Sequence, residues 1–440
     1  MPKETAVIIL AAGKGTRMKS SMPKVLHPIC GKPMIGHVLD ISLHLNPSEI
    51  VTVLSEGMND VAESIGHICH TAIQKEQLGT ADAVKPALEK LKGFDGNIII
   101  LYADTPLIEV STLKDMLLKL EDSDVAVLGF RPEDPAEYGR LVVNESGDLE
   151  KIVEYKDATA TERKNHLCNS GVIGARSEVL FEIINKISND NAKGEYYLTD
   201  LISLARDSGK KCGYIESNED EVLGVNNRVQ LSEAEYICQQ RLRYAAMIEG
   251  ATLFDPETVY FSHDTKIGKD VVIHPNVTFG PGVWIDDKVE IKSFCHIEEA
   301  RISRGCSVGP FARIRPGTEL ESGAHIGNFV EIKKSKIGKG AKIGHLTYIG
   351  DAEIGDKANI GAGTVTCNYD GYNKYKTQIG EGAFIGSNSA LVAPVTIGKG
   401  AFIGAGSTIT KNIDDYALAV ARNRQINKEN WAKRKQKAKE

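Results

Sequence analysis

The chain has 440 residues, of which 42% are hydrophobic and 25% are charged, so its length predicts two domains of ordinary globular composition. A formal net charge of -6 gives no overall attraction to nucleic acid or an anionic membrane, so any phosphate must be bound by local groups. No apolar run approaches the ~20 residues that span a bilayer, and the eight scattered cysteines form no CxxC pair, a pattern typical of free thiols in a reducing cytoplasm.

Residues 1–227 alternate apolar runs with helical stretches. This pattern predicts an α/β domain with a mostly parallel sheet and helices on both of its faces. Ligands of such sheets bind beyond the carboxyl ends of the strands, so the loops there are where chemistry is expected. The predicted strands are residues 7–10, 50–54, 97–101 and 125–130, and the predicted helices are residues 111–120 and 178–187.

The first strand runs into a glycine-rich turn, Leu10-Ala11-Ala12-Gly13-Lys14-Gly15-Thr16-Arg17, and Pro23-Lys24 follows shortly. Small residues after a buried strand let backbone N–H groups approach a phosphate. Arg17 and Lys24 add positive charge where phosphoryl transfer concentrates negative charge. The order of a Walker motif is absent. A glycine-rich turn alone is most often just a tight turn, but the full run with the Pro-Lys pair predicts a nucleotide site.

Residues 228–250 are interpreted as a linker, because charged and apolar residues interleave over 231–250 as in a single amphipathic helix. From residue 251 to 440 the pattern changes again. An apolar residue recurs every six positions, as in Ile267, Ile273 and Phe279, and glycine often follows it. A six-residue period is the hexapeptide signature of a parallel β-helix, whose apolar residues point into the prism.

The period does not give the hand of the coil, for which the usual crossover preference would be right-handed. The segment from Cys367 to Gln378 interrupts the period without adding apolar core. It is therefore expected to loop out of the coil, and loops on a rigid scaffold commonly carry function. The lysine-rich tail from Asn427 onward is interpreted as a solvated end.

With these features the chain resembles the sugar-1-phosphate nucleotidyltransferases, specifically the bifunctional N-acetylglucosamine-1-phosphate uridyltransferase / glucosamine-1-phosphate acetyltransferase family, over essentially its whole length. Its motifs include Gln77-Leu78-Gly79-Thr80, Tyr102-Ala103-Asp104, Tyr138-Gly139-Arg140 and Gly224-Val225-Asn226-Asn227-Arg228. The resemblance implies a Rossmann-like N-terminal domain followed by an all-β left-handed, not right-handed, parallel β-helix.

The resemblance also implies two reactions. The C-terminal domain would transfer acetyl from acetyl-CoA to glucosamine-1-phosphate, and the N-terminal domain would transfer UMP from UTP to the acetylated sugar phosphate, releasing pyrophosphate. It further implies Mg2+, a homotrimer, a cytoplasmic location and a place in cell-wall precursor synthesis, with no nucleic-acid or membrane partner.

By that likeness Asp104 and Asn226 hold Mg2+, and an oxygen-only pair suits this ion. Arg17 and Lys24 would act on the phosphates, and no protein nucleophile is needed. A lone Asp after a strand is more often a helix cap, but the ordered motifs favour a metal ligand. The residues implied to bind UTP and the sugar nucleotide are Leu10, Ala11, Ala12, Gly13, Lys24, Gln74, Gly79, Thr80, Tyr102, Ala103, Asp104, Gly139, Glu154, Asn169 and Asn226.

In the repeat, His345 lies on a turn flank rather than at an inward position, where an isolated histidine would more often be a plain surface residue. By the resemblance it is the base that deprotonates the substrate amine, and an imidazole with an unperturbed pKa of ~6.5 suits that task. The residues implied to bind the sugar phosphate are Arg315, Lys333, Tyr348, Asn359 and, with its carboxylate near the amine, Glu331. Those implied to bind acetyl-CoA, between adjacent coils of a trimer, are Ala362, Asn368, Tyr369, Ser387, Ala405 and Arg422.

Two positions depart from the family pattern. Ala136-Glu137 precedes Tyr138, where relatives often carry glycine, and Arg424 takes a place often held by proline. Two other functions stay open. A single-activity sugar nucleotidyltransferase with a structural β-helix predicts no base cluster in the coil. A nucleotide-sugar sensor predicts loss of residues such as Lys24 or His345, which are present.

Overall fold

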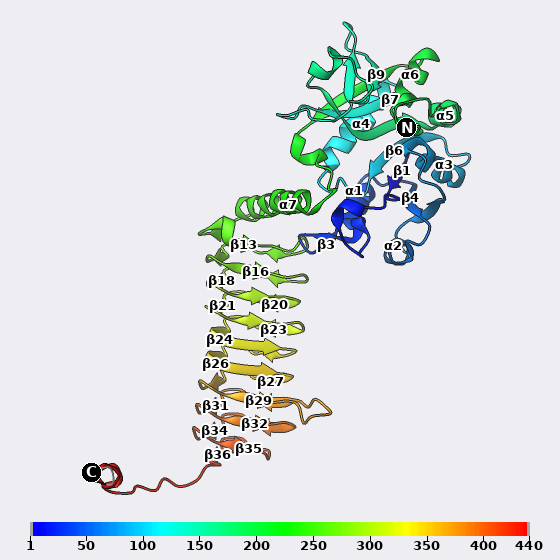
Figure 1. Cartoon of the computed structure of the whole chain (residues 1–440). Helices are drawn as coiled ribbons and strands as arrows, with labels where there is room; N and C mark the ends of the chain where they lie inside the picture. The colour runs from blue at the N-terminus through cyan, green and yellow to red at the C-terminus, as the bar shows by residue number, and fades with distance from the viewer. Residues whose placement is uncertain (1–2, 438–440) are drawn as a thin grey trace. The chain divides into compact units, whose positions relative to one another are not determined.

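The computed structural model describes residues 3–437 and forms two compact units, of which one ends at Cys238 and the other begins at Gln239. The first unit contains a nine-stranded sheet with the order β11-β7-β10-β6-β1-β4-β5, extended by β8 and β9 (Figure 1). The strands are β1 (Glu4–Leu10), β4 (Glu49–Ser55), β5 (His70–Gln74), β6 (Gly96–Tyr102), β7 (Val125–Phe130), β8 (Arg140–Val143), β9 (Leu149–Val153), β10 (Cys168–Arg176) and β11 (Cys212–Ser217). A separate hairpin joins β2 (Pro28–Ile29) to β3 (Lys32–Pro33).

The sheet is mostly parallel, as predicted, with one exception in its middle. Strands β5, β4, β1 and β6 run parallel, and so do β7 and β11. Strand β10 lies between β6 and β7 and is antiparallel to both. All four predicted strands are present, and the one predicted at 125–130 has the bounds of β7.

Helices cover both faces of this sheet because its buried strands are apolar on both sides. In β1, Ala6 and Ile8 face a cluster that includes residues of α3 (Thr80–Lys90), α5 (Ser177–Ile183) and α6 (Asp200–Asp207). Val7 and Ile9 face a cluster that includes residues of α1 (Met34–Leu43), α2 (Asn59–Ile65) and α4 (Val110–Asp122). The helix predicted at 178–187 is α-helical only in α5 and continues as a 3-10 turn, η4 (Ile184–Lys186).

The predicted amphipathic helix is α7 (Arg228–Ile248). Its C-terminal half belongs to the second unit. There Gln239 and Arg243, both buried, donate hydrogen bonds to the carbonyl oxygens of Phe261 and Val259, at 2.7 and 2.9 Å. These bonds fix the end of α7 to the first coil.

The second unit is a stack of three-sided coils joined by parallel pairing (Figure 1). One side is an eight-stranded sheet: β14 (Lys266–Ile267), β17 (Trp284–Ile285), β20 (Ala300–Ile302), β23 (Thr318–Leu320), β25 (Lys336–Ile337), β27 (Ala352–Ile354), β30 (Thr377–Ile379) and β33 (Val395–Ile397).

A 17-stranded sheet supplies the remaining sides. Its strands are β12 (Thr252–Leu253), β13 (Val259–Tyr260), β15 (Val272–Ile273), β16 (Val277–Phe279), β18 (Glu290–Ile291), β19 (His296–Ile297), β21 (Ser307–Val308), β22 (Arg313–Ile314), β24 (His325–Lys333), β26 (Lys342–Gly350), β28 (Asn359–Ile360), β29 (Val365–Cys367), β31 (Phe384–Ile385), β32 (Ala390–Val392), β34 (Phe402–Ile403), β35 (Thr408–Ile409) and β36 (Leu418–Ala419). A short helix, α8 (Trp431–Lys437), follows.

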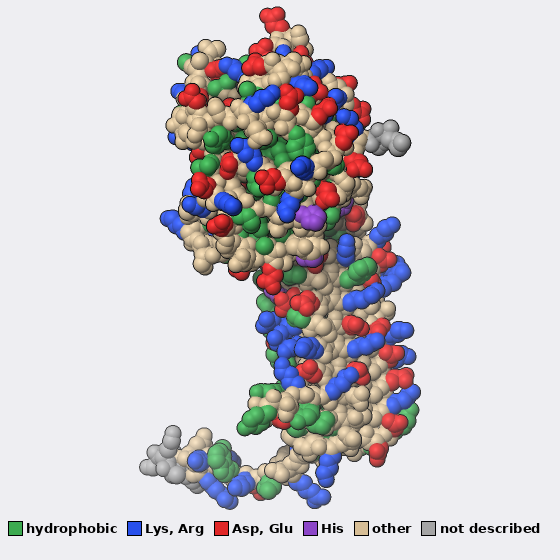
Figure 2. All heavy atoms as spheres, turned by 90° about the vertical axis from the view of Figure 1, so that its right-hand side faces the viewer, with side chains coloured by type: hydrophobic (Ala, Val, Ile, Leu, Met, Phe, Trp, Pro, Cys, Tyr) green, Lys and Arg blue, Asp and Glu red, His purple; other side chains and the backbone are tan. Residues whose placement is uncertain are grey.

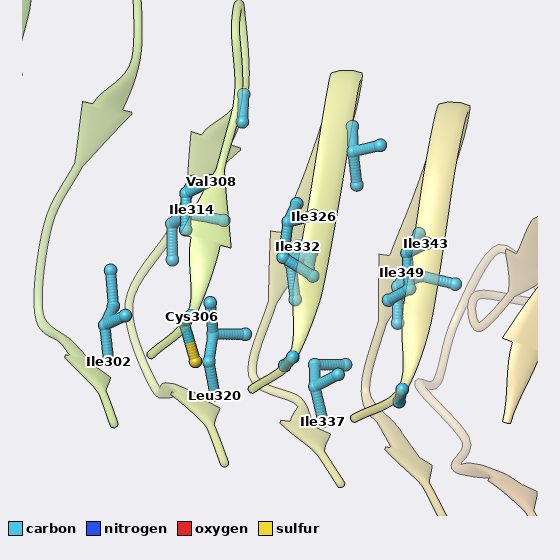
Figure 3. Packing of buried hydrophobic residues seen from close by; sticks show 14 of the residues in the cluster. Ile302, Cys306, Val308, Ile314, Leu320, Ile326, Ile332, Ile337, Ile343 and Ile349 are labelled. Atoms are coloured by element: carbon cyan, nitrogen blue, oxygen red, sulfur yellow. The ribbon is translucent and has the colours of Figure 1, made fainter. Parts of the chain in front are cut away.

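The hexapeptide positions form the core of this unit, as predicted. Figure 3 shows the column Ile314, Ile332 and Ile349, which pair in register on successive coils. All three are fully buried, and burial of each such side chain contributes about 1.5–3 kcal/mol. Outside the core, Lys and Arg side chains are interleaved with Asp and Glu (Figure 2), and ion pairs such as Lys399–Glu381, at 2.8 Å, link coils.

The interruption after β29 loops out, as predicted. Residues 368–376 lie between β29 and β30, and an isolated bridge pairs Tyr369 with Lys374. The strands on either side keep the coil register, because β29 pairs with β32 and β30 pairs with β27 and β33. None of the eight cysteines, all of which are described, forms a disulfide. Within residues 3–437, no helix combines the length and apolar character needed to cross a membrane.

Candidate active sites

A cavity of about 270 Å³ opens at the carboxyl ends of β1 and β6 in the first unit. This is the edge of a parallel sheet where ligands bind. The cavity gathers most of the nucleotide-site residues that the sequence predicts. Its predicted lining residues are Leu10, Ala11, Ala12, Gly13, Lys24, Gln74, Gly79, Thr80, Tyr102 and Asp104.

Lys24 contacts both predicted metal ligands in this cavity. Its Nζ lies 2.5 Å from Asp104 Oδ2 and 3.2 Å from Asn226 Oδ1. The Lys24 and Asp104 side chains are only 10% and 23% exposed, so the ion pair is screened little by solvent. The two oxygens thus converge on one point that already holds a cation.

Backbone contacts fix both oxygens at that point. The N–H of Val225 donates to the Asp104 carbonyl oxygen at 2.8 Å, which joins the two motifs. The Asn226 Nδ2 donates to the Gly224 carbonyl oxygen at 3.3 Å, and this bond turns Oδ1 toward Lys24. A carboxylate and an amide oxygen suit Mg2+, which takes its other ligands from water and phosphate. Among residues 3–437 no group of three or more His, Cys, Asp or Glu side chains forms a metal centre by itself.

The loop before α3 requires glycine at Gly79. Its φ is +127°, and a Cβ there would lie 2.5 Å from the carbonyl oxygen of Tyr196. The approach is tight because the Tyr196 N–H donates to the Leu78 carbonyl oxygen at 2.8 Å, and the Tyr196 carbonyl oxygen accepts from the Ala81 N–H at 2.9 Å. The same contact brings Glu195 to the cavity wall, a residue that the sequence did not predict.

Three residues of the predicted set, Gly139, Glu154 and Asn169, lie outside the cavity lining but adjoin it through Tyr102. The Tyr102 ring packs against Gly171, where a Cβ would approach it to 2.9 Å. Gly139 and Asn169 are joined by a bond from the Asn169 N–H to the Gly139 carbonyl oxygen, at 2.9 Å. Burial raises the pKa of Tyr102, so its hydroxyl remains a hydrogen-bond donor.

Glu154 is one of the residues implied to bind the sugar nucleotide. Thr199 Oγ1 donates to its Oε1 at 3.4 Å, and burial raises the pKa of Glu154 above its ordinary value. Two predicted residues have other positions. Ala103 is buried behind the cavity, its N–H bonded to the Leu10 carbonyl oxygen. Arg17 lies in the 3-10 turn η1 (Thr16–Met18), where it is exposed and does not line the cavity.

The first departure from the family pattern lies in left-handed backbone. Ala136 has a φ of 37°, a conformation that favours glycine. The Arg140 guanidinium is 2% exposed and donates to the carbonyl oxygens of Ala136, at 3.0 Å, and Tyr138. Those bonds hold the chain in a conformation that alanine does not favour. The second departure, Arg424, lies in the exposed tail.

The second site lies where the long strands β24 and β26 turn a corner of the coil. His345 is exposed there, and its Nδ1 is hydrogen-bonded to Oδ1 of Asn328, its partner in register on the preceding coil. Because an amide oxygen accepts, the tautomer that satisfies this contact carries its proton on Nδ1. Nε2 therefore carries the free lone pair that a general base needs.

Other cations surround Lys333, the last residue of β24. Arg315 Nη1 pairs with Glu331 Oε1 at 2.7 Å. The pKa of Lys333 is lowered, mainly by Lys374 and further by burial, Arg315 and Lys334. A group of cations this close together forms a site for an anion such as a sugar phosphate. Lys374 comes from the loop at 368–376 and was not predicted.

Tyr348 and Asn368 meet at Gly350. A Cβ on Gly350 would lie 2.4 Å from the Tyr348 hydroxyl and 2.9 Å from Asn368 Nδ2. Asn368 Nδ2 also donates to Asp351 Oδ2 at 2.5 Å, which anchors the loop to the coil. Tyr369 is 59% exposed on the same loop.

The predicted acetyl-CoA residues of the coil form a ladder along one corner. Asn388 N–H donates to the Ala362 carbonyl oxygen, and Gly406 N–H donates to the Ser387 carbonyl oxygen, both at 2.7 Å. Gly386 is in close contact with Ala405 on the following coil. Arg422 lies against Gly406, with its Cδ 3.9 Å from the position of an added Cβ. Asn359 lies apart from this corner, in register with Lys342 and Phe384 on a strand face.

The sequence analysis assigned no role at these sites to Glu195, Asn328 and Lys374. Asn328 stands in the motif Gly327-Asn328-Phe329, 17 residues before His345. That spacing is close to three hexapeptides, or one full coil. The coil period alone therefore places residues 328 and 345 side by side, and this signal was available. Nothing comparable marks Glu195 or Lys374.

Comparisons with known proteins agree with both halves. Residues 7–165 match the family model of the MobA-like NTP transferase domain, and residues 264–299 and 376–411 match that of the bacterial transferase hexapeptide (six repeats). Together with the parallel coils, the hexapeptide match makes the second unit a left-handed parallel β-helix, as the resemblance implied.

Curated relatives match almost end to end. The Bifunctional protein GlmU of Rhodospirillum rubrum is 56% identical over 98% of this chain and 96% of its own. The proteins of the same name from Paramagnetospirillum magneticum and Zymomonas mobilis are 54% and 51% identical, over 98% of this chain and 96% and 97% of theirs. A solved CMP:2-keto-3-deoxy-manno-octonic acid synthetase complexed with CTP has a TM-score of 0.42 and 19% identity over 54% of this chain and 99% of its own, which is too slight a likeness to carry an argument.

Proposed function

Because the chain belongs to the family of bifunctional GlmU proteins, we propose that its two sites divide the family's two reactions between them. The chain is a bifunctional transferase. It transfers acetyl from acetyl-CoA to glucosamine-1-phosphate, and it transfers UMP from UTP to N-acetylglucosamine-1-phosphate, which yields UDP-N-acetylglucosamine and pyrophosphate. This product supplies cell-wall precursor synthesis. A single-activity nucleotidyltransferase with a structural β-helix is not favoured.

The corner formed by Asn328 and His345 is the observation that supports acetyl transfer in the coil. His345 Nε2 takes the proton from the substrate amine as nitrogen attacks the thioester carbonyl, and the thiol of CoA leaves. Arg315, Lys333 and Lys374 hold the sugar phosphate through charge-assisted bonds. We assign Glu331, which pairs with Arg315, to orienting the amine, and Tyr348 and Asn359 to contacts with the sugar.

The cavity at the end of β1 is assigned to uridyl transfer. The backbone of the turn from Ala11 to Gly13 binds the triphosphate, and Arg17 and Lys24 neutralise its charge. Mg2+, held by Asp104 and Asn226, supplies further neutralisation when bound. Gly139, Glu154 and Asn169 orient the sugar so that its phosphate oxygen attacks the α-phosphorus and pyrophosphate leaves.

We assign residues 1–227 to uridyl transfer, 228–250 to a linker helix and 251–440 to acetyl transfer. We also propose a homotrimer in the cytoplasm. The support for assembly is a stack of exposed aromatic rings on one corner of the coil. The ring centroids of Phe294, Phe311 and Phe329 are 4.8 and 5.0 Å apart, and the side chains are 52%, 46% and 54% exposed. Such a row fits the interface between copies, and cysteines without disulfides fit the cytoplasm.

The test is a reaction with glucosamine-1-phosphate, acetyl-CoA, UTP and Mg2+, followed by mass spectrometry with thiol and pyrophosphate assays. We expect UDP-N-acetylglucosamine with both co-products. His345→Ala stops thiol release, yet uridyl transfer from supplied N-acetylglucosamine-1-phosphate continues. If the unsubstituted chain never releases thiol, the coil is a scaffold and the assignment of His345 is wrong.

A further inference from the structure

We propose that Lys24 is an exchangeable counter-ion: its ammonium occupies the position between Asp104 and Asn226 until a divalent metal displaces it toward the phosphates. The inference rests on the proposed function in one respect, namely that Asp104 and Asn226 are the metal ligands. It adds that metal binding and the placement of a catalytic cation are one event.

The geometry allows only one cation at a time. The Lys24 Nζ lies 2.5 Å from Asp104 Oδ2 and 3.2 Å from Asn226 Oδ1. Mg2+ binds oxygen at about 2.0–2.1 Å and keeps near-octahedral ligands. A metal that shared those two oxygens would overlap the ammonium. Because like charges repel strongly in a half-buried site, a bound divalent ion drives the ammonium away.

The lysine stem lets its tip move while its base stays fixed. Gly15, whose φ is +60°, lies so close to Lys24 that an added Cβ would stand 2.6 Å from the Lys24 Cβ. The first carbon of the side chain is therefore held against the glycine-rich turn that binds phosphate. The three flexible carbons beyond it then carry the charge. Displacement from Asp104 leaves the ammonium beside the same turn, where the triphosphate of UTP lies in the proposed complex.

Mn2+ binding to the full chain without nucleotide tests the exchange, with free Mn2+ followed by electron paramagnetic resonance. Lys24→Met removes the competing cation but keeps the length of the stem. We expect it to bind Mn2+ at least tenfold more tightly, a change of about 1.4 kcal/mol. Lys14→Met is the matched control, since Lys14 is an exposed lysine of the same turn, and it leaves the affinity unchanged.

A Lys24→Met affinity equal to or weaker than that of the unsubstituted chain overturns the exchange. Failure of the underlying assignment gives a different result. If Asp104→Asn in the Lys24→Met background binds Mn2+ as tightly as Lys24→Met alone, Asp104 is not a ligand. Circular dichroism and acetyl transfer at the second site, both expected to be unchanged, show that each variant is folded.

Discussion

At the scale of single residues, both sites depend on side chains that the fold brings together from distant parts of the chain. Lys24 and Asp104 stand in short motifs after β1 and β6, and the cavity gathers them. Glu195 reaches the same cavity only because Tyr196 pairs with the loop before α3. Lys374 reaches Lys333 only because a loop folds back on the coil. Neither return path leaves a periodic signal in the sequence.

Asn328 is expected to be a positioning residue for the base. Asn328→Ala removes the acceptor of the Nδ1 hydrogen bond. The imidazole is then free to rotate, and its Nε2 lone pair no longer points steadily at the substrate amine. We expect kcat for acetyl transfer to fall about 10–100-fold, with little change in KM for acetyl-CoA. Asn328→Asp, which retains an acceptor, recovers much of the rate. Full activity in Asn328→Ala would mean that other groups orient His345.

Because of Glu154, we expect sugar binding to weaken at acid pH. Burial raises its pKa, so acidification neutralises this carboxylate at a higher pH than an ordinary glutamate. The neutral acid is a poorer acceptor, so KM for N-acetylglucosamine-1-phosphate rises as pH falls through the raised pKa. Glu154→Gln flattens that rise in a KM–pH profile. An unchanged acid limb in the variant would assign it to another group.

The raised pKa of Glu154 also determines how the free energy of unfolding changes with pH. The folded state binds the Glu154 proton more tightly than the unfolded state. The free energy of unfolding therefore declines as pH rises from the ordinary pKa of glutamate to the raised one, and it is level above that window. Denaturant titrations of Glu154→Gln should lack this contribution.

At the scale of elements, the six-residue period predicts the coil almost residue by residue, since each apolar position has one place in the prism. The α/β half is less fully determined. An apolar run such as that of β10 does not reveal whether the strand runs parallel or antiparallel to its neighbours. Its antiparallel placement between β6 and β7 was therefore not predictable. The helix over 178–187 ended early, at Ile183, because the following residues form a 3-10 turn that the period does not distinguish.

Two glycines of adjacent coils give a matched test of how closely the catalytic strands approach. A Cβ on Gly327 would lie 1.7 Å from the Gly344 carbonyl oxygen, whereas a Cβ on Gly344 meets nothing within 4 Å. We expect Gly327→Ala to destabilise the coiled unit by about 2–3 kcal/mol and Gly344→Ala by no more than about 0.5 kcal/mol.

Tryptophan fluorescence during denaturation measures this selectively, because both tryptophans of the chain, Trp284 and Trp431, lie in the second unit. Equal stabilities for the two variants would show that β24 and β26 separate more easily than their spacing implies.

At the scale of the whole molecule, the change of sequence pattern predicts two units and a helix between them. The linker proposed at 228–250 contains the point where the two compact units divide, between Cys238 and Gln239. In α7, Glu235 accepts a bond from the Cys30 N–H within the first unit, and Gln239 bonds to Phe261 within the second. The amphipathic pattern predicts such a helix, but it does not predict which of its residues bond to each of the two units.

Assembly is expected to depend on the aromatic row at Phe294, Phe311 and Phe329. Phe311→Lys places a charge in the middle of it, so sedimentation should show monomers in place of trimers, and acetyl transfer should fall with assembly. Uridyl transfer should persist. Trp284→Lys is the matched control, because Trp284 is a 50% exposed aromatic residue on the eight-stranded sheet. This variant should remain trimeric. A trimeric Phe311→Lys would place the interface elsewhere.

The pairing of the coils also determines where the second unit opens first. Each coil is hydrogen-bonded only to its neighbours, so opening begins at the ends of such a stack and spreads inward. Strands β24 and β26 stand at the middle of the 17-stranded sheet. Backbone amides should accordingly exchange with deuterium fastest near β36 and slowest around His345. Opening at the end of the stack therefore leaves His345 in its position.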